Sequence, residues 1–393
     1  MPQFTHTPQE QPQETLTDRQ SLTIGLPACQ SPSERRFPLT PEAAAELTER
    51  GFRIKMEAGA TAAINYTDNQ YMRAGVSVGT RSEALGCDIV IHLAPLEAAD
   101  VRKMRRGTML LTLLKPQNQH TDAIKELLKR HIIAIALDLI EDSGGCTPFA
   151  DILAEIDGRA SVAMASSLLA DATRGKGILL GGVAGIIPCE VLVIGSGIAA
   201  CAAARSAVGL GATVRMYDND VYSLRRASQQ LGPWVITSTL HPHTLENALR
   251  AADVVVATPT TEPFSAGSEL TSVMKRGVLA FDLSSDSGKA FPAMTPVDLA
   301  DALAVRESAS LRERICFVHA GCAVARTAAM ALSNTLITLM SSIVSCEGVS
   351  NALKLLPGMQ KATYTFFGRI VNPQVAKAAG MRSVDISIYL TLS

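Results

Sequence analysis

The chain has 393 residues, of which 47% are hydrophobic, 19% charged and 4% aromatic, and its formal net charge is −1. This length predicts two domains with aliphatic cores, and the near-neutral charge argues against a nucleic-acid-binding protein or one held on an anionic membrane surface. The eight cysteines are scattered without a CxxC pair, which argues against a metal site and favours a reducing, cytoplasmic location.

The first 150 residues alternate apolar runs with helix-like segments. Residues 1–20 are rich in Gln, Pro, Thr and Glu, which predicts a disordered tail, and they lack the pattern of a signal peptide. A helix capped by Thr40 is expected at 42–49. Strands are expected at 22–26, 53–57, 88–93, 109–114 and 132–139. This rhythm predicts a doubly wound α/β domain, and because it has no glycine-rich turn, we expect it to bind something other than a dinucleotide.

A long helix is expected at 151–173, where the chain crosses to its second half. The apolar segment 178–198 follows it. Three glycines and Pro188 interrupt this segment, so it is interpreted as a loop and a strand, and no membrane span is predicted.

The segment from Glu190 to Asp220 has the pattern of a dinucleotide-binding unit. An apolar run at 191–194 predicts a buried strand, and a GxGxxA turn and an Ala-rich helix follow it; the alternative is a tight turn that binds no ligand. Asp218 ends the next predicted strand, where a carboxylate binds the ribose of NAD and repels the extra phosphate of NADP. The predicted cofactor is therefore NAD, although Arg225 and Arg226 leave a 2′-phosphate site open. The expected cofactor-binding residues are Gly195, Ser196, Gly197, Ile198, Ala199, Ala200 and Asp218.

The remaining elements complete a second α/β unit. Strands are expected at 253–257, 278–283 and 316–318, a long apolar helix at 326–344, and short helices in the tail at 347–393. The predicted fold class is α/β, with two doubly wound Rossmann-like domains, parallel sheets and a substrate cleft between them. The predicted domains are a disordered tail at 1–20, a substrate domain at 21–156 and 322–393, and an NAD-binding Rossmann domain at 157–321.

Over nearly all of 21–340 the chain resembles the alanine dehydrogenase and nicotinamide nucleotide transhydrogenase α-subunit family, and it is most similar to the alanine dehydrogenases. The resemblance is carried, in order, by RRFPLTPEAAAEL at 35–47, MEAGA at 56–60, GKGILLGGVAGIIPCEVLVIGSG at 175–197, FDLSSDSG at 281–288 and AVARTAAMALSN at 323–334. It implies reversible, NAD-linked oxidative deamination of L-alanine to pyruvate and ammonia. It also implies a homo-oligomer, which in this family is a hexamer.

Two residues match the family's substrate site. Arg36 matches the arginine before LTP that holds the substrate carboxylate, and a guanidinium fork suits a carboxylate bidentately. Asp286 matches the family's catalytic aspartate and follows the end of a predicted strand, although Lys289 replaces the second glycine of the family's VDxxxDxGG pattern. The alternatives are a solvated loop arginine and a turn aspartate.

Two other positions depart from the family's alanine dehydrogenases. Ala94 occupies the position of a lysine that contacts the substrate carbonyl, and Lys115 occupies that of a catalytic histidine. On a strand, residues two apart share a face, so His92 is expected to point to the side of Ala94. We therefore predict His92 and Lys115 as an exchanged acid–base pair, the alternatives being a buried histidine and a surface lysine.

Three functions remain after these observations. The expected one is an NAD-dependent dehydrogenase of a small L-amino acid. A transhydrogenase-type protein, which passes hydride to NADP on a partner, is favoured by APL at 94–96 and PQNQ at 116–119 and disfavoured by EDSGGCTPFA at 141–150. A catalytically inactive NAD-binding homologue explains Ala94 most simply, but such a protein would have no chemical need of Arg36 and Asp286.

Overall fold

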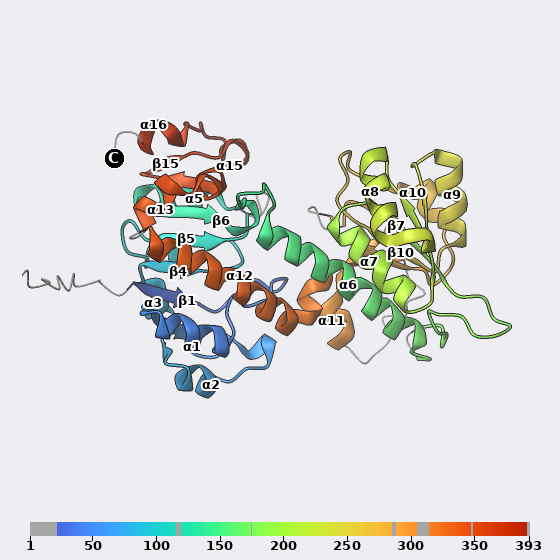
Figure 1. The fold of residues 1–393 in the computed structure, drawn as a ribbon, viewed down its shortest axis with the longest axis horizontal. Coiled ribbons are helices and arrows are strands. Elements are labelled where there is room, and N and C mark those ends of the chain that lie inside the picture. Colours follow the sequence, from blue (N-terminus) through green and yellow to red (C-terminus); the bar gives the residue numbers. More distant parts are fainter. Residues whose placement is uncertain are drawn as a thin grey trace, which may run out of the picture.

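The chain folds into two lobes, each built around one β-sheet (Figure 1). The computed structural model describes residues 22–114, 119–173, 175–284, 288–304, 314–346 and 349–390. Helix α6 (Pro148–Ala170) runs from the first lobe to the second, and α12 (Ala325–Ser345) packs against α6 and returns to the first lobe. The first lobe is therefore built from both ends of the described chain.

The first sheet has eight strands within the described residues. They are β1 (Thr23–Leu26), β2 (Arg53–Glu57), β3 (Ser77–Gly79), β4 (Ile89–Ile91), β5 (Met109–Thr112), β6 (Ile133–Ala136), β14 (Thr363–Phe366) and β15 (Arg369–Ile370). Their order is β15-β14-β6-β5-β4-β1-β2-β3, in which β1 to β6 pair in parallel and the two C-terminal strands pair antiparallel. The strand order reverses between β1 and β4, and ligands of such sheets bind at the carboxyl ends of the strands beside this point.

Helices cover both faces of the first sheet, because its central strands place apolar side chains on both faces. Ile89 and Ile91 pack in a core with α1 (Pro41–Glu49), α6 and α12, whereas Val90 packs in a core with α4, α5 and α15. Thr40 caps α1 as predicted, since its side-chain oxygen accepts a hydrogen bond from the Ala43 N–H. The other helices of this lobe are α2 (Asp68–Arg73), α3 (Arg81–Leu85), α4 (Ala98–Val101), α5 (Thr121–Lys129), α13 (Val349–Leu355), α14 (Pro357–Ala362), α15 (Pro373–Ala379) and α16 (Ile386–Leu390).

The second sheet has seven parallel strands within the described residues. They are β7 (Glu190–Ile194), β8 (Thr213–Tyr217), β9 (Val235–Ser238), β10 (Val254–Ala257), β11 (Leu279–Asp282), β12 (Thr295–Asp298) and β13 (Ile315–Val318). Their order is β12-β13-β11-β10-β7-β8-β9, which reverses between β10 and β7. The crevice of this sheet therefore lies at the end of β7, where the glycine turn begins.

Helices also cover both faces of the second sheet. Val191 and Val193 pack with α6, α7 (Ile198–Gly209), α8 (Val221–Leu231) and α11 (Leu299–Ala304). Leu192 and Ile194 pack on the other face with α9 (Pro242–Ala251) and α10 (Ser268–Ser272). The predicted α/β fold class, with two doubly wound and mostly parallel sheets, is confirmed.

Two features of the C-terminal part modify the sequence-based expectations. The tail contributes β14 and β15 to the first sheet in addition to short helices, and Thr365 Oγ1 donates to the Ile132 carbonyl at 2.9 Å. One helix, Ala320–Ser345, is long and apolar enough to span a membrane by length and composition, with a mean hydropathy of 1.4. Its apolar residues Leu332, Leu336 and Met340 are fully buried in the core of the first lobe, which is how an apolar core helix packs.

Candidate active site

The glycine turn follows β7 at the crevice of the second sheet. Gly195 has a φ of +101°, and a Cβ there would lie 2.2 Å from Thr258 Oγ1, so a side chain does not fit at this position. The Gly195 N–H donates to the Tyr217 carbonyl at 2.7 Å. The backbone of the turn is therefore fixed against the end of β8.

The N-terminus of α7 lies open beyond this turn. A Cβ at Gly197 would meet no atom within 4 Å, and no side chain caps the helix that begins at Ile198. The first N–H groups of α7 are therefore available to a pyrophosphate, which the helix dipole also favours. Gly158 of α6 packs closely against the start of α7. A Cβ at this position would lie 2.1 Å from the Ala199 carbonyl oxygen.

Asp218 lies at the end of β8, beside the turn. It is 5% exposed, and its Oδ2 accepts a hydrogen bond from Ser196 Oγ at 2.6 Å. Its Oδ1 accepts from the Asp220 N–H at 3.0 Å. Each carboxylate oxygen keeps a second lone pair, so Asp218 can still accept a hydrogen bond from a ribose hydroxyl.

A cavity of about 370 Å³ adjoins the turn, and its lining includes Ser196, Gly197, Ile198, Arg205 and Arg226. Of the two arginines on α8, only Arg226 lines it. Arg225 lies over the ring of Tyr222 instead, with its Cζ 5.8 Å from the ring centroid. The open turn, the uncapped helix and the acid at the end of the next strand together fit a dinucleotide.

Arg36 lies in the loop that follows β1 and is only 9% exposed. Its Nε and Nη2 donate to Oε1 and Oε2 of Glu34 at 2.7 and 2.6 Å, and its backbone N–H donates to Oε1 at 3.1 Å. Glu34 is 2% exposed, so this bidentate ion pair is buried. The edge of the guanidinium formed by Nη1 and Nη2 has no further acceptor among the described residues, and it can bind a second carboxylate.

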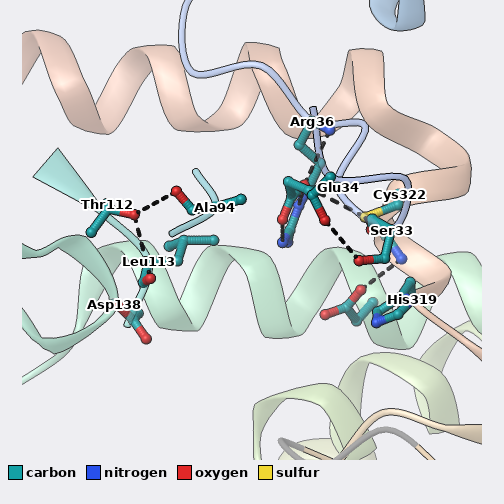
Figure 2. Close-up of polar contacts among 12 residues, drawn as sticks. Ser33, Glu34, Arg36, Ala94, Thr112, Leu113, Asp138, His319 and Cys322 are labelled. Carbon is teal, nitrogen blue, oxygen red and sulfur yellow. Dashed lines mark hydrogen bonds and ion pairs between the residues drawn. The ribbon is translucent and has the colours of Figure 1, made fainter. Parts of the chain in front are cut away.

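Residues of both lobes surround this ion pair, and we call Glu34, Arg36, Asp157, His319 and Cys322 the junction cluster. The Cys322 Sγ contacts the Glu34 Oε1 at 3.6 Å, and the Cys322 N–H donates to the His319 carbonyl at 2.9 Å. Figure 2 shows Glu34 and Cys322 between Arg36 and His319, beside α6. The cluster therefore joins the loop after β1 to the segment after β13.

Asp157 brings a second carboxylate to the junction cluster from α6. Its Oδ1 accepts a hydrogen bond from the Gly321 N–H at 2.6 Å. Burial raises the pKa of Asp157, and the nearby Arg36 offsets this only in part. The cluster thus places two carboxylates near one guanidinium.

His319 follows β13 directly, with a φ of 56° and a ψ of 43°. Its Nδ1 lies 3.0 Å from the Oδ2 of Asp298, which is the last residue of the neighbouring strand β12. The two side chains are 28% and 14% exposed. A carboxylate that holds an imidazole in this way sets its tautomer and orientation.

His92 and Ala94 lie in a different place from Arg36. Both line a cavity of about 370 Å³ together with Arg81, Asp100 and His120, and Arg36 is not among its lining residues. His92 is 4% exposed, and its Nδ1 bonds to the Ala94 carbonyl oxygen at 2.5 Å. Thr112 Oγ1 donates to the same carbonyl at 3.2 Å (Figure 2). Burial lowers the pKa of His92, so the ring is held neutral inside the lobe.

Lys115 and Asp286, two of the predicted catalytic residues, lie outside the described residues. Strand β11, which precedes Asp286 in the sequence, ends at Asp282. This residue is 1% exposed. Its Oδ2 accepts hydrogen bonds from the Gly288 and Ala290 N–H groups at 2.7 and 3.1 Å. This buried carboxylate therefore binds the backbone of residues that follow Asp286 in the sequence.

Comparisons with known proteins assign this architecture to a family. The model of the Alanine dehydrogenase/PNT N-terminal domain matches residues 25–156, and that of the C-terminal domain matches residues 161–373. The chain belongs to the alanine dehydrogenase/PNT family. It is 28% identical to alanine dehydrogenase of Mycobacterium tuberculosis, across 92% of this chain and 97% of that protein. It is 27% identical to alanine dehydrogenase of Geobacillus stearothermophilus, across 94% and 100%.

Solved structures of this family have the same fold. An L-alanine dehydrogenase superposes with a TM-score of 0.78 at 23% identity, across 91% of this chain and 99% of that one. A transhydrogenase from Sinorhizobium meliloti superposes with a TM-score of 0.70 at 20% identity, across 89% and 99%. The fold is thus common to proteins with both names.

Of the five residues of the junction cluster in this family member, only Arg36 was predicted from the sequence; Cys322 was one of eight scattered cysteines. Glu34 and Asp157 had no motif of their own, because nothing in their local sequence distinguishes either acid from one on a solvated surface. His319 did have a signal, since it follows a predicted strand at 316–318 and so lies at the edge of the sheet where ligands bind. Its partner Asp298 could not be paired with it from sequence.

Proposed function

We propose that this member of the alanine dehydrogenase/PNT family is an NAD(H)-dependent dehydrogenase that interconverts a small L-amino acid of the alanine class with its 2-oxo acid and ammonia. The observation that carries the proposal is an open dinucleotide turn in one lobe together with a buried arginine at the lobe junction. The two relatives from Mycobacterium tuberculosis and Geobacillus stearothermophilus agree with this proposal, because both are alanine dehydrogenases.

The cofactor-binding residues are the turn from Gly195 to Ala200 and Asp218. The N–H groups at the start of α7 bind the pyrophosphate, and Asp218 accepts a hydrogen bond from a ribose hydroxyl. When bound, NAD(H) supplies or accepts the hydride. Ligands of doubly wound sheets extend over the carboxyl ends of the strands, which in this lobe include β10, β11 and β13.

The substrate carboxylate binds Arg36 at the Nη1–Nη2 edge. Glu34 holds the opposite edge in a buried bidentate pair, so the guanidinium cannot rotate without breaking charge-assisted hydrogen bonds. Asp286 and Lys115 remain proposed catalytic residues. His92 is the weakest of the three sequence-based candidates, because its ring is buried and lines a cavity that excludes Arg36.

We further propose the domain boundaries, location and assembly. Residues 21–156 and 322–393 form the substrate domain and 157–321 the NAD-binding domain, which agrees with the two sheets.

All eight cysteines are free, which supports a reducing cytoplasm. A homo-oligomer is supported by an apolar loop on the second lobe, where Leu179, Ile186 and Ile187 are 66%, 67% and 90% exposed.

The test is oxidation of NADH, followed by absorbance, with ammonium and a series of small 2-oxo acids that includes pyruvate and glyoxylate. The proposal requires turnover that depends on both ammonium and the oxo acid. Arg36→Lys should raise KM for the oxo acid while leaving NADH affinity unchanged, because an ammonium cannot reproduce the fork. Binding of NADH without turnover of any oxo acid in the series would contradict the proposal.

The second candidate is an NAD(H)-binding protein without an amino-acid substrate of its own, which includes the transhydrogenase-type function. It is favoured by Ala94, which offers no titratable group and whose carbonyl is already bonded to His92 and Thr112. Hydride transfer from NADH to an NADP analogue supplied with a partner, in the absence of ammonium, would support it.

A further inference from the structure

We propose that His319, oriented by Asp298, is an acid–base residue of this site, in addition to the proposed catalytic residues Asp286 and Lys115. The proposal rests on the proposed dehydrogenase function. It concerns a residue that neither the sequence motifs nor the family resemblance singled out.

The side chains of His319 and Asp298 are paired. The Nδ1 of His319 lies 3.0 Å from the Asp298 Oδ2, while the Asp298 Oδ1 accepts from the Ala300 N–H at 3.0 Å. Because the carboxylate is held by the backbone, it fixes the direction of the ring and places the exchangeable proton on Nδ1 in the neutral form. Nε2 is then the atom that donates or accepts a proton in the reaction. A base oriented by a third group is the arrangement that acid–base catalysis uses.

The backbone at His319 also supports the proposal. Its φ of 56° and ψ of 43° lie in the left-handed region, which is unfavourable for an L-residue other than glycine. The turn that follows holds this conformation, since the Cys322 N–H donates to the His319 carbonyl at 2.9 Å. Such conformations cluster at functional sites, where they aim a side chain. His319 has this conformation directly after the carboxyl end of β13, within the junction cluster.

Exposure separates His319 from the histidine predicted from sequence. The side chain of His319 is 28% exposed, whereas His92 is 4% exposed and its Nδ1 is bonded to the Ala94 carbonyl oxygen. The ring of His319 is therefore the more accessible of the two. His319 also belongs to the cluster that contains Arg36, whereas His92 lines a cavity without it.

The proton transfers can be written in full for reductive amination. Ammonia adds to C2 of the oxo acid, forming the C–N bond while a proton moves from nitrogen to oxygen, which gives a carbinolamine. Protonated His319 then donates its Nε2 proton to the carbinolamine hydroxyl. The C–O bond breaks, water leaves, and the nitrogen lone pair forms the C=N bond of an iminium ion. After hydride reduction of this carbon, His319 regains a proton from solvent. In deamination, neutral Nε2 accepts a proton from the water that attacks the iminium carbon.

The decisive variant is His319→Asn. Asparagine tolerates the left-handed backbone and keeps an amide donor for Asp298, but it cannot transfer a proton. We expect kcat for reductive amination to fall by about 10²-fold or more, with NADH affinity unchanged. The matched control is His131→Asn, because His131 also has a positive φ, of 55°, but its Nε2 lies 2.9 Å from Arg106 Nη2, away from the junction. Its kcat should equal that of the wild type.

Two further variants separate catalysis from a structural role. His319→Gly relieves the backbone and leaves room for a ring, so added imidazole should restore part of the lost kcat. Asp298→Asn should lower kcat more than it changes KM, and imidazole should not rescue it. Equal kcat in the wild type and His319→Asn, or a loss in His319→Gly that imidazole does not reverse, would overturn the assignment while leaving the dehydrogenase function intact.

A binding measurement distinguishes failure of the proposal from failure of the function. Oxamate is a non-reducible analogue of pyruvate, and we would add it to the NADH complex of protein labelled with 15N at its seven histidines. The ring signal that disappears in His319→Asn should shift on addition of oxamate. No turnover in the wild type would overturn both proposals. Turnover with no shift of this signal and no effect of His319→Asn would overturn only the role of His319.

Discussion

The two lobes present different kinds of surface at the ends of their strands. At the second sheet the features that fit a ligand belong to the backbone, because Gly195 and Gly197 act through the absence of a Cβ and α7 acts through its free N–H groups. At the first sheet they belong to side chains, because Arg36 acts through a charge that Glu34 keeps buried. A binding site formed by backbone groups keeps its function when many of the side chains around it are substituted. A side-chain site changes with a single substitution, as Ala94 illustrates.

The largest expected effect concerns the side-chain site. Glu34→Gln removes the bidentate charged partner of the buried Arg36 guanidinium, so the free energy of unfolding should fall by about 3–5 kcal/mol. Denaturation with urea, followed by circular dichroism, measures it. The control is Asp301→Asn, which breaks an exposed pair with Arg35 and should cost at most about 1 kcal/mol.

A double variant sharpens the same prediction. Glu34→Gln combined with Arg36→Met removes both charges of the bidentate pair, and it should recover most of the stability that Glu34→Gln loses, because the guanidinium that lost its partner is removed as well. If the two single variants at 34 and 301 were equally stable, the ion pair would not be buried in solution.

The next effect concerns the backbone site. Gly195→Ala should weaken NADH binding by about 100-fold, or 2.7 kcal/mol, because its positive φ and the contact with Thr258 force the turn to move. Gly197→Ala should weaken NADH binding without loss of stability, since a Cβ there meets no protein atom but would meet the pyrophosphate. Gly209→Ala, which also has open space, is the control and should bind NADH normally. Equal affinities in all three variants would place the dinucleotide elsewhere.

Local signals account for what could be predicted of the fold. The strand at 53–57 was predicted with the observed bounds, because alternating polar and apolar residues between turn signals form a local pattern. β14 and β15 were missed, since β14 forms by pairing Thr363 with Ile135 far away in the sequence. Four alternating residues do not indicate a strand until that partner is known.

The residues of the candidate site also divide into those that a local motif predicts and those that only the fold brings together. The glycine turn and Asp218 lie within one continuous motif, whereas Asp157 meets Gly321, which is 164 residues away. His319 meets Asp298 only because β12 and β13 are neighbours, and β12 is a half-exposed edge strand with a proline, which lacks the apolar pattern of a strand. Contacts of this kind follow from topology and not from spacing.

Cofactor choice should depend on the Asp218 carboxylate and on the hydroxyl that holds it. We expect the wild type to bind NADH at least tenfold more tightly than NADPH, a difference of about 1.4 kcal/mol. Asp218→Asn should abolish most of this preference, and Ser196→Ala should reduce it less, because it removes only the 2.6 Å hydrogen bond. Fluorescence titration of both nucleotides measures the ratio. An unchanged ratio in Asp218→Asn would assign selectivity to another group, of which Arg226 is the first to test.

The smallest expected effect is a pH dependence of stability that originates at Asp157. Burial raises the pKa of this carboxyl above its ordinary value of 3.8, with Arg36 opposing the change, so the folded state binds its proton more tightly than the unfolded state. The stabilisation from this group is therefore complete below the unfolded pKa and is lost as the pH rises through the folded one. Asp157→Asn keeps an acceptor for the Gly321 N–H and removes the titration. At pH 8 the variant should unfold at a temperature about 2–4 °C higher than the wild type, which is the shift that about 1 kcal/mol produces in a domain of this size. Near pH 4 the two melting temperatures should converge. A constant difference across this range would show that the junction cluster tolerates the ionised carboxylate, and that the effect of the substitution has another cause.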